Sequence, residues 1–162
     1  MNKLNLGSGN DYMEGWTNVE IIEELKGDVR HDLNVYPYPF PDNEFDEIRA
    51  ASILEHLDKP IEALKEMIRI AKDGAKITII VPHAHSYSAV TDLQHKTFFT
   101  ENSFNPTCMI EYGIKGLELE SYRFFSVTGA NKWKNWIPFR KYLKIFFMGM
   151  YDEIEFVFKV KK

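Results

Sequence analysis

The chain has 162 residues, 44% of them hydrophobic, and a formal net charge of -4 at pH 7. This length allows one domain with a sizeable core, so we predict a single domain over residues 1–162. The net charge disfavours a mainly electrostatic nucleic-acid binder, and one cysteine, Cys108, excludes an intramolecular disulfide framework. With no signal-like start and no apolar run long enough for a membrane span, we expect a cytoplasmic protein.

The first informative stretch is the tripeptide Gly7-Ser8-Gly9, which follows a short apolar run near the start of the chain. Glycine lets a backbone turn tightly and approach a small molecule closely. A dinucleotide fingerprint would need a third glycine where Tyr12 stands. Near the end of the next predicted strand, 16–22, lies Glu20, whose carboxylate can accept both hydroxyls of a ribose. The pattern favours a nucleoside ligand that lacks a pyrophosphate.

The remaining elements follow from hydrophobic periodicity. We predict strands over 28–33, 45–51 and 75–81, and a helix from Pro60 to about Lys72. Further elements are a helix start at Thr100, a short helix within 105–116, and strands over 117–127 and 153–160. This order predicts a Rossmann-like, doubly wound α/β sheet, mostly parallel with a terminal antiparallel strand, in a three-layer sandwich.

Ligands of such sheets bind at the carboxyl ends of the strands, where the glycine tripeptide and several polar residues converge. In their order along residues 3–104, the motifs of this chain resemble the class I S-adenosylmethionine-dependent methyltransferases. These motifs are Leu4-Asn5-Leu6-Gly7-Ser8-Gly9-Asn10, Gly15-Trp16-Thr17-Asn18-Val19-Glu20, His31-Asp32-Leu33, residues 39–48, Leu54-Glu55-His56-Leu57 and Asp73-Gly74-Ala75. The resemblance implies S-adenosylmethionine as cofactor and S-adenosylhomocysteine as product.

The resemblance also implies roles for individual residues. The glycine tripeptide would line the methionine part of the cofactor, Glu20 the ribose, and Asp32 with Leu33 the adenine, while Ser52, Glu55 and His56 would close the pocket beside the methyl group. Plainer interpretations exist for each: a tight turn, solvated acids at strand ends, or local packing of the histidine. The chain departs from the family in its curtailed first helix, in the lack of N-terminal lid helices, and at Ala75, where a glycine is common.

A second informative stretch, 82–100, carries histidines after the buried strand over 75–81. A hydroxyl or protonated amine must lose a proton during methylation, and a histidine is well matched to accept it. Our first choice is His95, oriented by Asp92, and His83 and His85 are second choices. At least one of these histidines is expected only to satisfy hydrogen bonds of the loop.

The same four side chains also raise the alternative of a metal site. Their spacing matches no closed structural site, and cysteine ligands are absent. From the sequence we therefore predict no metal site.

Residues 131–148 hold five basic residues and no acidic one, interleaved with aromatic residues. Such a segment can receive an anionic acceptor or rest on a membrane surface. Packing on the sheet or a homodimer interface is the favoured interpretation, because a small domain with few helices needs apolar cover.

The sequence thus predicts a methyltransferase acting on an oxygen or nitrogen atom of a small-molecule or glycan-like acceptor. One alternative is a non-catalytic nucleoside-binding or interaction module of the same fold. A nucleic-acid methyltransferase is the third interpretation. It is disfavoured because no Asn/Asp-Pro-Pro-aromatic motif follows the strand over 45–51, where enzymes that methylate the amino groups of nucleobases often carry one. Cys108 also lies outside the expected cleft, so it is not placed as a nucleophile for carbon methylation of cytosine.

Overall fold

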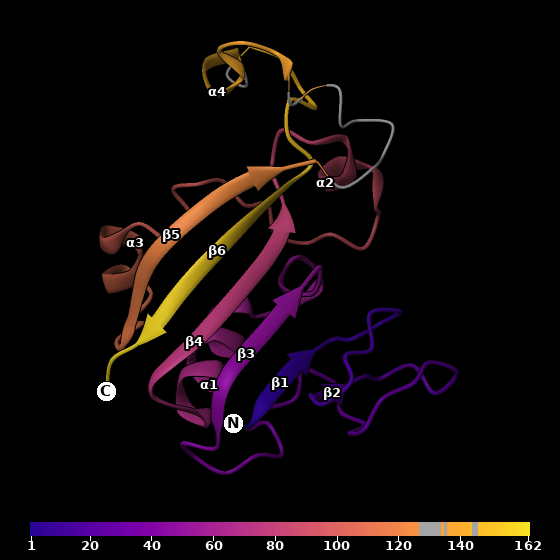
Figure 1. The fold of residues 1–162 in the computed structure, drawn as a ribbon, viewed down its shortest axis with the longest axis vertical. Coiled ribbons are helices and arrows are strands. Elements are labelled where there is room, and N and C mark those ends of the chain that lie inside the picture. Colours follow the sequence, from indigo (N-terminus) through magenta and orange to yellow (C-terminus); the bar gives the residue numbers. More distant parts are fainter. Residues whose placement is uncertain (127–133, 135, 144–145) are drawn as a thin grey trace.

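The computed structural model describes residues 1–126, 134, 136–143 and 146–162. Six strands form one sheet in the order β2-β1-β3-β4-β6-β5 (Figure 1). Their bounds are β1 Lys3–Leu6, β2 Thr17–Val19, β3 Phe45–Ala51, β4 Ala71–Pro82, β5 Leu117–Phe125 and β6 Glu153–Val160. The first four strands run parallel, and β6 lies antiparallel between β4 and β5. The predicted mixed, mostly parallel α/β sheet is confirmed.

Short helices join these strands: η1 Leu54–His56, α1 Pro60–Ile70, α2 Tyr87–Thr91, α3 Pro106–Glu111 and α4 Arg140–Leu143. In α1 a proline opens the first turn, and the buried Ala63, Leu64, Met67 and Ile70 recur at helical spacing. Figure 1 shows α1 and α3 behind the sheet, while α2 and α4 lie beyond the carboxyl ends of the parallel strands. None of the described helices is long and apolar enough to cross a membrane.

The two faces of the sheet differ in polarity. On the helix-covered face, Ile77 and Ile79 of β4 and Phe156 and Phe158 of β6 are fully buried. The opposite face carries charged side chains, such as Lys76, whose ammonium lies 3.3 Å from a carboxylate oxygen of Glu47. The described segments that follow β1 and β2 contain no helix to cover this face. Among the described residues the arrangement therefore has two layers, which corrects the three-layer prediction.

The strand predicted over 28–33 is wrong. Only Val29 pairs, through an isolated bridge to Val19. The carboxylate of Asp28 instead accepts hydrogen bonds from the backbone and side chain of Asn18, at 2.7 and 2.9 Å. Backbone pairing here consists of the N–H groups of Asp28 and Val29 donating to the Asn18 carbonyl and the N–H of Glu20 donating to the Val29 carbonyl. It does not continue through residues 30–33.

Two boundaries also differ from the prediction. Residues after Thr100 form turns, and the helix begins after Asn105, whose side chain accepts from the backbone N–H of Cys108 at 2.9 Å. Helix α1 ends at Ile70 rather than near Lys72, because Ala71 already pairs with Phe45 across the sheet. The strands over 45–51 and 153–160 lie where the sequence predicts them.

Candidate functional site

The glycine loop turns directly out of β1. Gly7 has a φ of 64°, and a Cβ atom built on it would lie 2.7 Å from a side-chain carbon of Ile53. Gly9 has a φ of 50°, and a Cβ atom built there would lie in open space, with none of the described atoms outside its chain neighbours within 4 Å. The backbone N–H of Ser8 donates to the carbonyl of Val19 at 2.9 Å. The loop is thus fixed against β2 and the turn after β3.

Glu20, at the end of β2, holds this loop through its carboxylate. Although only 5% of the residue is exposed, three backbone N–H groups donate to it. Oε2 accepts from Gly9 at 2.6 Å, and Oε1 accepts from Ile21 and Ile22 at 2.9 Å each. A carboxylate offers about four acceptor positions, so three are taken in this arrangement. Two ribose hydroxyls would have to displace at least one of these amides.

One cavity brings most of the predicted cofactor residues together at the carboxyl ends of the strands. Its volume is about 400 Å³, within the ordinary range for small-molecule sites. The predicted residues along its wall are Gly7, Gly9, Glu20, Asp32, Leu33, Ser52 and His56. Ser8 and Glu55 do not line it.

The predicted adenine end of this cavity lies in a turn. Oδ1 of Asp32 accepts from the backbone N–H of Asn34 at 2.9 Å, which fixes the carboxylate in the turn. Leu33 beside it is 6% exposed. Across the cavity, Ser52 adopts a φ of 50°, and its N–H donates to the carbonyl of Ile80 at 2.8 Å. Such a φ is uncommon outside glycine, so surrounding contacts hold this turn.

A second cavity, of about 530 Å³, lies on the other side of the glycine loop. It shares Gly7, Gly9 and Ser52 with the first and adds Arg49 and Glu153. The guanidinium of Arg49 lies 2.8 Å from Asp11, and burial raises the pKa of Glu153, assisted by the charge of Asp152. The sequence did not single out Arg49 and Glu153. Their strands carry other charged residues, Asp46 and Glu47 in β3 and Glu155 and Lys159 in β6, so neither charge stood out.

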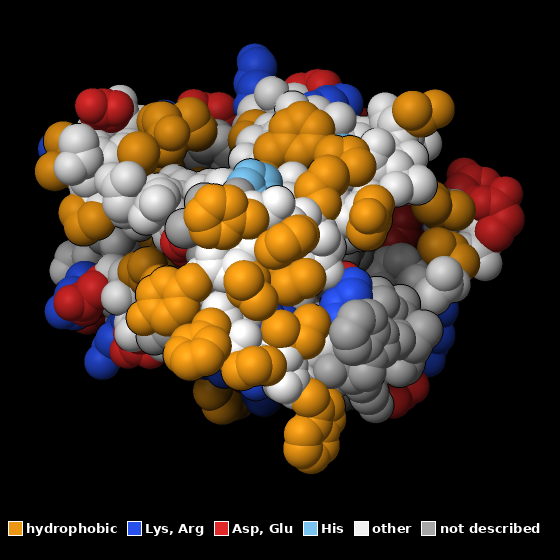
Figure 2. Space-filling view, turned by 90° about the horizontal axis from the view of Figure 1, so that it is seen from above, with side chains coloured by type: hydrophobic (Ala, Val, Ile, Leu, Met, Phe, Trp, Pro, Cys, Tyr) orange, Lys and Arg blue, Asp and Glu red, His pale blue; other side chains and the backbone are white. Residues whose placement is uncertain are grey.

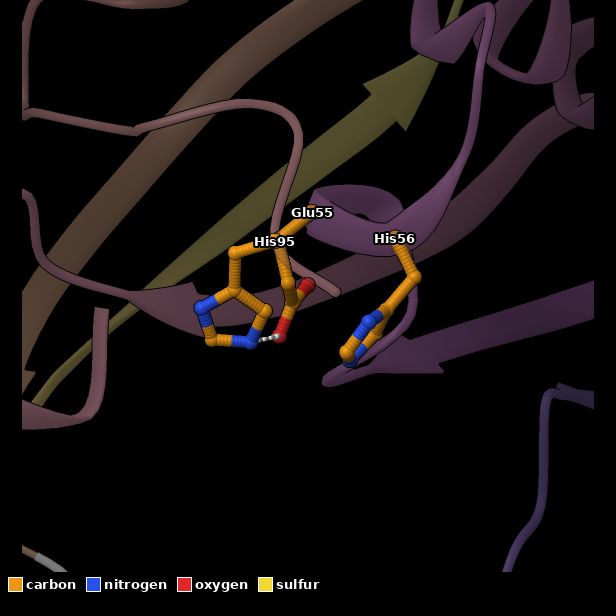
Figure 3. A group of neighbouring side chains, drawn as sticks. All are labelled: Glu55, His56 and His95. Atoms are coloured by element: carbon orange, nitrogen blue, oxygen red, sulfur yellow. Dashed lines mark ion pairs between the residues drawn. The ribbon is translucent and has the colours of Figure 1, made fainter. Parts of the chain in front are cut away.

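A third feature is the cluster of Glu55, His56 and His95 (Figure 3). The first two residues belong to η1, and His95 comes from the loop after α2. Backbone N–H groups of Lys96 and Thr97 donate to the Glu55 carbonyl at 2.7 and 3.3 Å, which ties this loop to the turn. Figure 3 shows the three side chains converging on one region, with the Glu55 carboxylate between the two rings.

Burial dominates the electrostatics of this cluster. Glu55 is 1% exposed, and its carboxylate oxygens have no hydrogen-bond partner among the described residues. Burial raises the pKa of Glu55 to about 7, although its own backbone N–H and, to a smaller extent, the charge of His95 oppose the shift. Burial also lowers the pKa of His56, and the charge of His95 lowers it further.

The predicted catalytic residues fall into two groups. Asp92 lies close to His95, with Oδ2 3.9 Å from Nε2 of the ring. His83 is buried and faces Glu101 at 3.4 Å, while His85 is exposed and donates its backbone N–H to the His83 ring at 3.2 Å. The structure therefore separates the pair that contains His95 from the pair that contains His83.

The carboxyl-end surface is rich in apolar side chains, which Figure 2 shows in orange. The exposed residues of α2 and of the segment 131–148 contribute Tyr87, Val90, Trp136, Phe139, Tyr142, Phe146, Phe147 and Met148. Residues 131–133, 135 and 144–145 of the predicted interface lie outside the described residues. The homodimer prediction stays a prediction.

Residues 14–79 match the family model described as a methyltransferase domain. A stretch of 44 residues is 41% identical to an uncharacterized methyltransferase of Schizosaccharomyces pombe. This stretch is 27% of the present chain and 16% of that relative, so the chain spans far less than the whole length of the protein it matches.

Solved structures share the fold over almost the whole chain. A SAM-dependent methyltransferase of Archaeoglobus fulgidus has a TM-score of 0.68 at 18% identity, covering 98% of this chain and 85% of that chain. A methyltransferase in complex with the Haloferax volcanii Trm112 methyltransferase activator has a TM-score of 0.66 at 13% identity, with coverages of 99% and 82%. The [4+2]-cyclase SpnF has a TM-score of 0.61 at 14% identity, with coverages of 99% and 75%. At these identities the likeness shows the fold alone.

Proposed function

We propose that this chain, whose residues 14–79 match the methyltransferase-domain model, is an S-adenosylmethionine-dependent enzyme that methylates an oxygen or nitrogen atom of a small-molecule or glycan-like acceptor. One observation carries the proposal. Two cavities meet at the loop of Gly7 and Gly9, and one of them is lined by Glu20 and Asp32. In the proposal one cavity holds the cofactor, and the other admits the acceptor.

The first cavity suits the nucleoside. Glu20 would accept the ribose hydroxyls after at least one backbone amide is released, and Asp32 with Leu33 would hold the adenine. The glycine loop allows the methionine part to approach the backbone closely, because Gly7 and Gly9 carry no Cβ. Of the remaining predicted cofactor residues, Ser8 lines the second cavity, and Glu55 is buried with its carboxylate between the rings of His56 and His95.

The second cavity suits a polar acceptor. Arg49 and Glu153 provide a cation and a partly buried acid along its wall. Methyl transfer from a sulfonium is an in-line displacement, in which the acceptor atom attacks the methyl carbon and S-adenosylhomocysteine leaves. Such a reaction depends mainly on holding the acceptor opposite the sulfur, and two adjoining cavities support that alignment.

A hydroxyl or protonated amine acceptor must also release a proton. The candidates remain His95 with Asp92, followed by His83 and His85. The His95 side chain is 7% exposed and adjoins the cofactor cavity through Gln94 and His56. Because the ring is buried, we expect the proton of a bulky acceptor to reach His95 through neighbouring groups rather than by direct contact with the ring.

Calorimetric titration with S-adenosylmethionine and S-adenosylhomocysteine tests the cofactor half of the proposal. Wild type should bind both ligands, and Glu20→Ala should bind at least about tenfold more weakly, because hydrogen bonds to a charged group contribute roughly 1.5–3 kcal/mol each. Glu120→Ala, an exposed acid on β5, is the matched control and should bind as wild type. Absence of binding to wild type at high ligand concentration would contradict the proposal.

A second candidate function is a non-catalytic nucleoside-binding module, since a fold does not by itself fix an activity; the solved structures that share this fold include a [4+2]-cyclase, SpnF. In this alternative the chain binds the nucleoside without transferring a methyl group. Release of S-adenosylhomocysteine in an acceptor screen separates the two functions. Cofactor binding without turnover on any hydroxyl or amine acceptor would favour the non-catalytic module.

A further inference from the structure

The geometry points to a binding site for a divalent transition-metal ion formed by Glu55, His56 and His95, beside the cofactor cavity. The structure brings these residues together from the turn after β3 and the loop after α2. Neither the family match nor the structural likeness assigns such a site. It also differs from the set of histidines that the sequence suggested and rejected, because only His95 belongs to both.

The Glu55 carboxylate is the first reason for the inference. It is 1% exposed, and neither oxygen has a hydrogen-bond partner in the described part of the chain. A buried polar group without a partner is costly, and buried carboxylates are usually paired or bound to a metal. By contrast Glu20, buried to a similar degree, accepts three backbone hydrogen bonds. The described residues therefore leave both carboxylate oxygens of Glu55 available to a bound ion.

The two histidines present the right atoms. Nδ1 of His95 lies 2.9 Å from the carbonyl of Ala89, a partner that can only accept, so in the neutral ring Nδ1 carries the proton and Nε2 offers its lone pair. Nε2 faces the Glu55 carboxylate (Figure 3). The backbone of Gln94 is a hydrogen-bond partner of the His56 ring. In a histidine that binds a metal through one ring nitrogen, the other ring nitrogen usually donates to a group such as a backbone carbonyl.

The distances fit an ion better than a direct contact. Nε2 of His95 and Oε1 of Glu55 are 4.0 Å apart, which is too long for a hydrogen bond. One ligand atom from each of the three residues lies within 4.8 Å of the others. Metal–ligand bonds of about 2.0–2.2 Å place neighbouring ligands of a tetrahedral ion roughly 3.3–3.6 Å apart. Small side-chain rotations would close the set around one ion.

The donor set restricts the kind of ion. Two imidazole nitrogens and one carboxylate oxygen suit Zn²⁺, Co²⁺, Mn²⁺ or Fe²⁺, whereas Mg²⁺ and Ca²⁺ prefer oxygen ligands. Three protein ligands leave at least one coordination position open for water or another small ligand. His56 lines the cofactor cavity, so the site borders the space where the cofactor is proposed to bind. A bound ion would engage Nε2 of His95, which makes that histidine a ligand rather than a free base.

Titration of untagged protein with Co²⁺ and Zn²⁺ after treatment with a chelator tests the inference without any methyl acceptor. Wild type should bind one Co²⁺ per chain with visible absorption of a low-symmetry site, and Zn²⁺ should displace it. Glu55→Gln and His95→Gln should each weaken Co²⁺ binding at least tenfold. The matched control is His85→Asn, an exposed histidine outside the cluster, which should bind as wild type.

Wild-type protein without one-to-one binding would overturn the inference, as would a Glu55→Gln variant that binds Co²⁺ like wild type. Nuclear magnetic resonance of the wild-type histidine rings guards against variants that fail to fold. Added Zn²⁺ should shift the ring signals of His56 and His95 and leave those of His31 unchanged. The reverse pattern would also overturn the inference. Because no S-adenosylmethionine is present, the result is independent of the proposed methyl transfer.

Discussion

The loop after β2 and the turn after β3 each bury one glutamate at the same end of the sheet, with opposite hydrogen bonding. Glu20 is 5% exposed and accepts from three backbone N–H groups. Glu55 is 1% exposed and has no hydrogen-bond partner for its carboxylate among the described residues. Two glutamates that are buried to a similar degree therefore differ in whether backbone N–H groups bind their carboxylates.

The difference shows how a carboxylate is stabilised away from water. Backbone amides satisfy the carboxylate oxygens of Glu20 and at the same time fix the glycine loop against β2. Glu55 lacks such donors in the described part of the chain, and burial raises its pKa. Glu20 thus supports the protein's own backbone, whereas Glu55 is left with capacity for a proton or a cation. Substitutions of Glu20, of the glycine loop that it fixes, and of Glu55 test this comparison.

The largest effect is expected for Glu20→Ala. It leaves the N–H groups of Gly9, Ile21 and Ile22 without their charged acceptor, so the free energy of unfolding should fall by about 3 kcal/mol or more. Urea denaturation of this variant and of the Glu120→Ala control measures the loss. A change under about 1 kcal/mol would break the comparison, because it would mean that water replaces the carboxylate without cost.

A smaller effect is expected for Gly7→Ala in the same loop. The new methyl group would meet Ile53 at 2.7 Å on a backbone with a φ of 64°, so we expect a loss of about 2–4 kcal/mol in the free energy of unfolding. Gly9→Ala is the matched variant, with a φ of 50° but open space around the methyl group, and should lose only about 1–2 kcal/mol. Equal losses would show that backbone strain, and not the contact with Ile53, limits residue 7.

The smallest effect is expected for Glu55→Gln in metal-free protein. The substitution removes a buried charge that makes no hydrogen bond within the described residues, so the free energy of unfolding should change by less than about 1 kcal/mol or rise slightly. Thermal or urea denaturation in the presence of a chelator measures it. A loss above about 2 kcal/mol would show that the carboxylate is satisfied inside the folded chain, and the contrast with Glu20 would disappear.

Local patterns in the sequence determined much of the fold. The alternation of 153–160 predicted β6 because its buried residues, Ile154, Phe156, Phe158 and Val160, all lie on one face. The helical spacing after Pro60 predicted α1 for the same kind of reason. The sequence predicted that the glycine loop, Glu20, Asp32 and Ser52 lie at strand ends. The structure places them around one cavity, although no strand precedes Asp32. Their roles toward the cofactor remain predictions.

Contacts between distant segments were decided only by the tertiary structure. The predicted strand over 28–33 is reduced to one bridge between Val29 and Val19. The described segments after β1 and β2 form no helix, which leaves one sheet face polar. Arg49 and Glu153 meet at the second cavity because β3 ends and β6 begins at the same edge of the sheet. Glu55 and His95 come together because backbone N–H groups after His95 bond to the Glu55 carbonyl. Hydrophobic periodicity predicts which residues share a face of one helix or strand. Contacts between residues of different elements depend on how those elements pack, and no local sequence pattern predicts that packing.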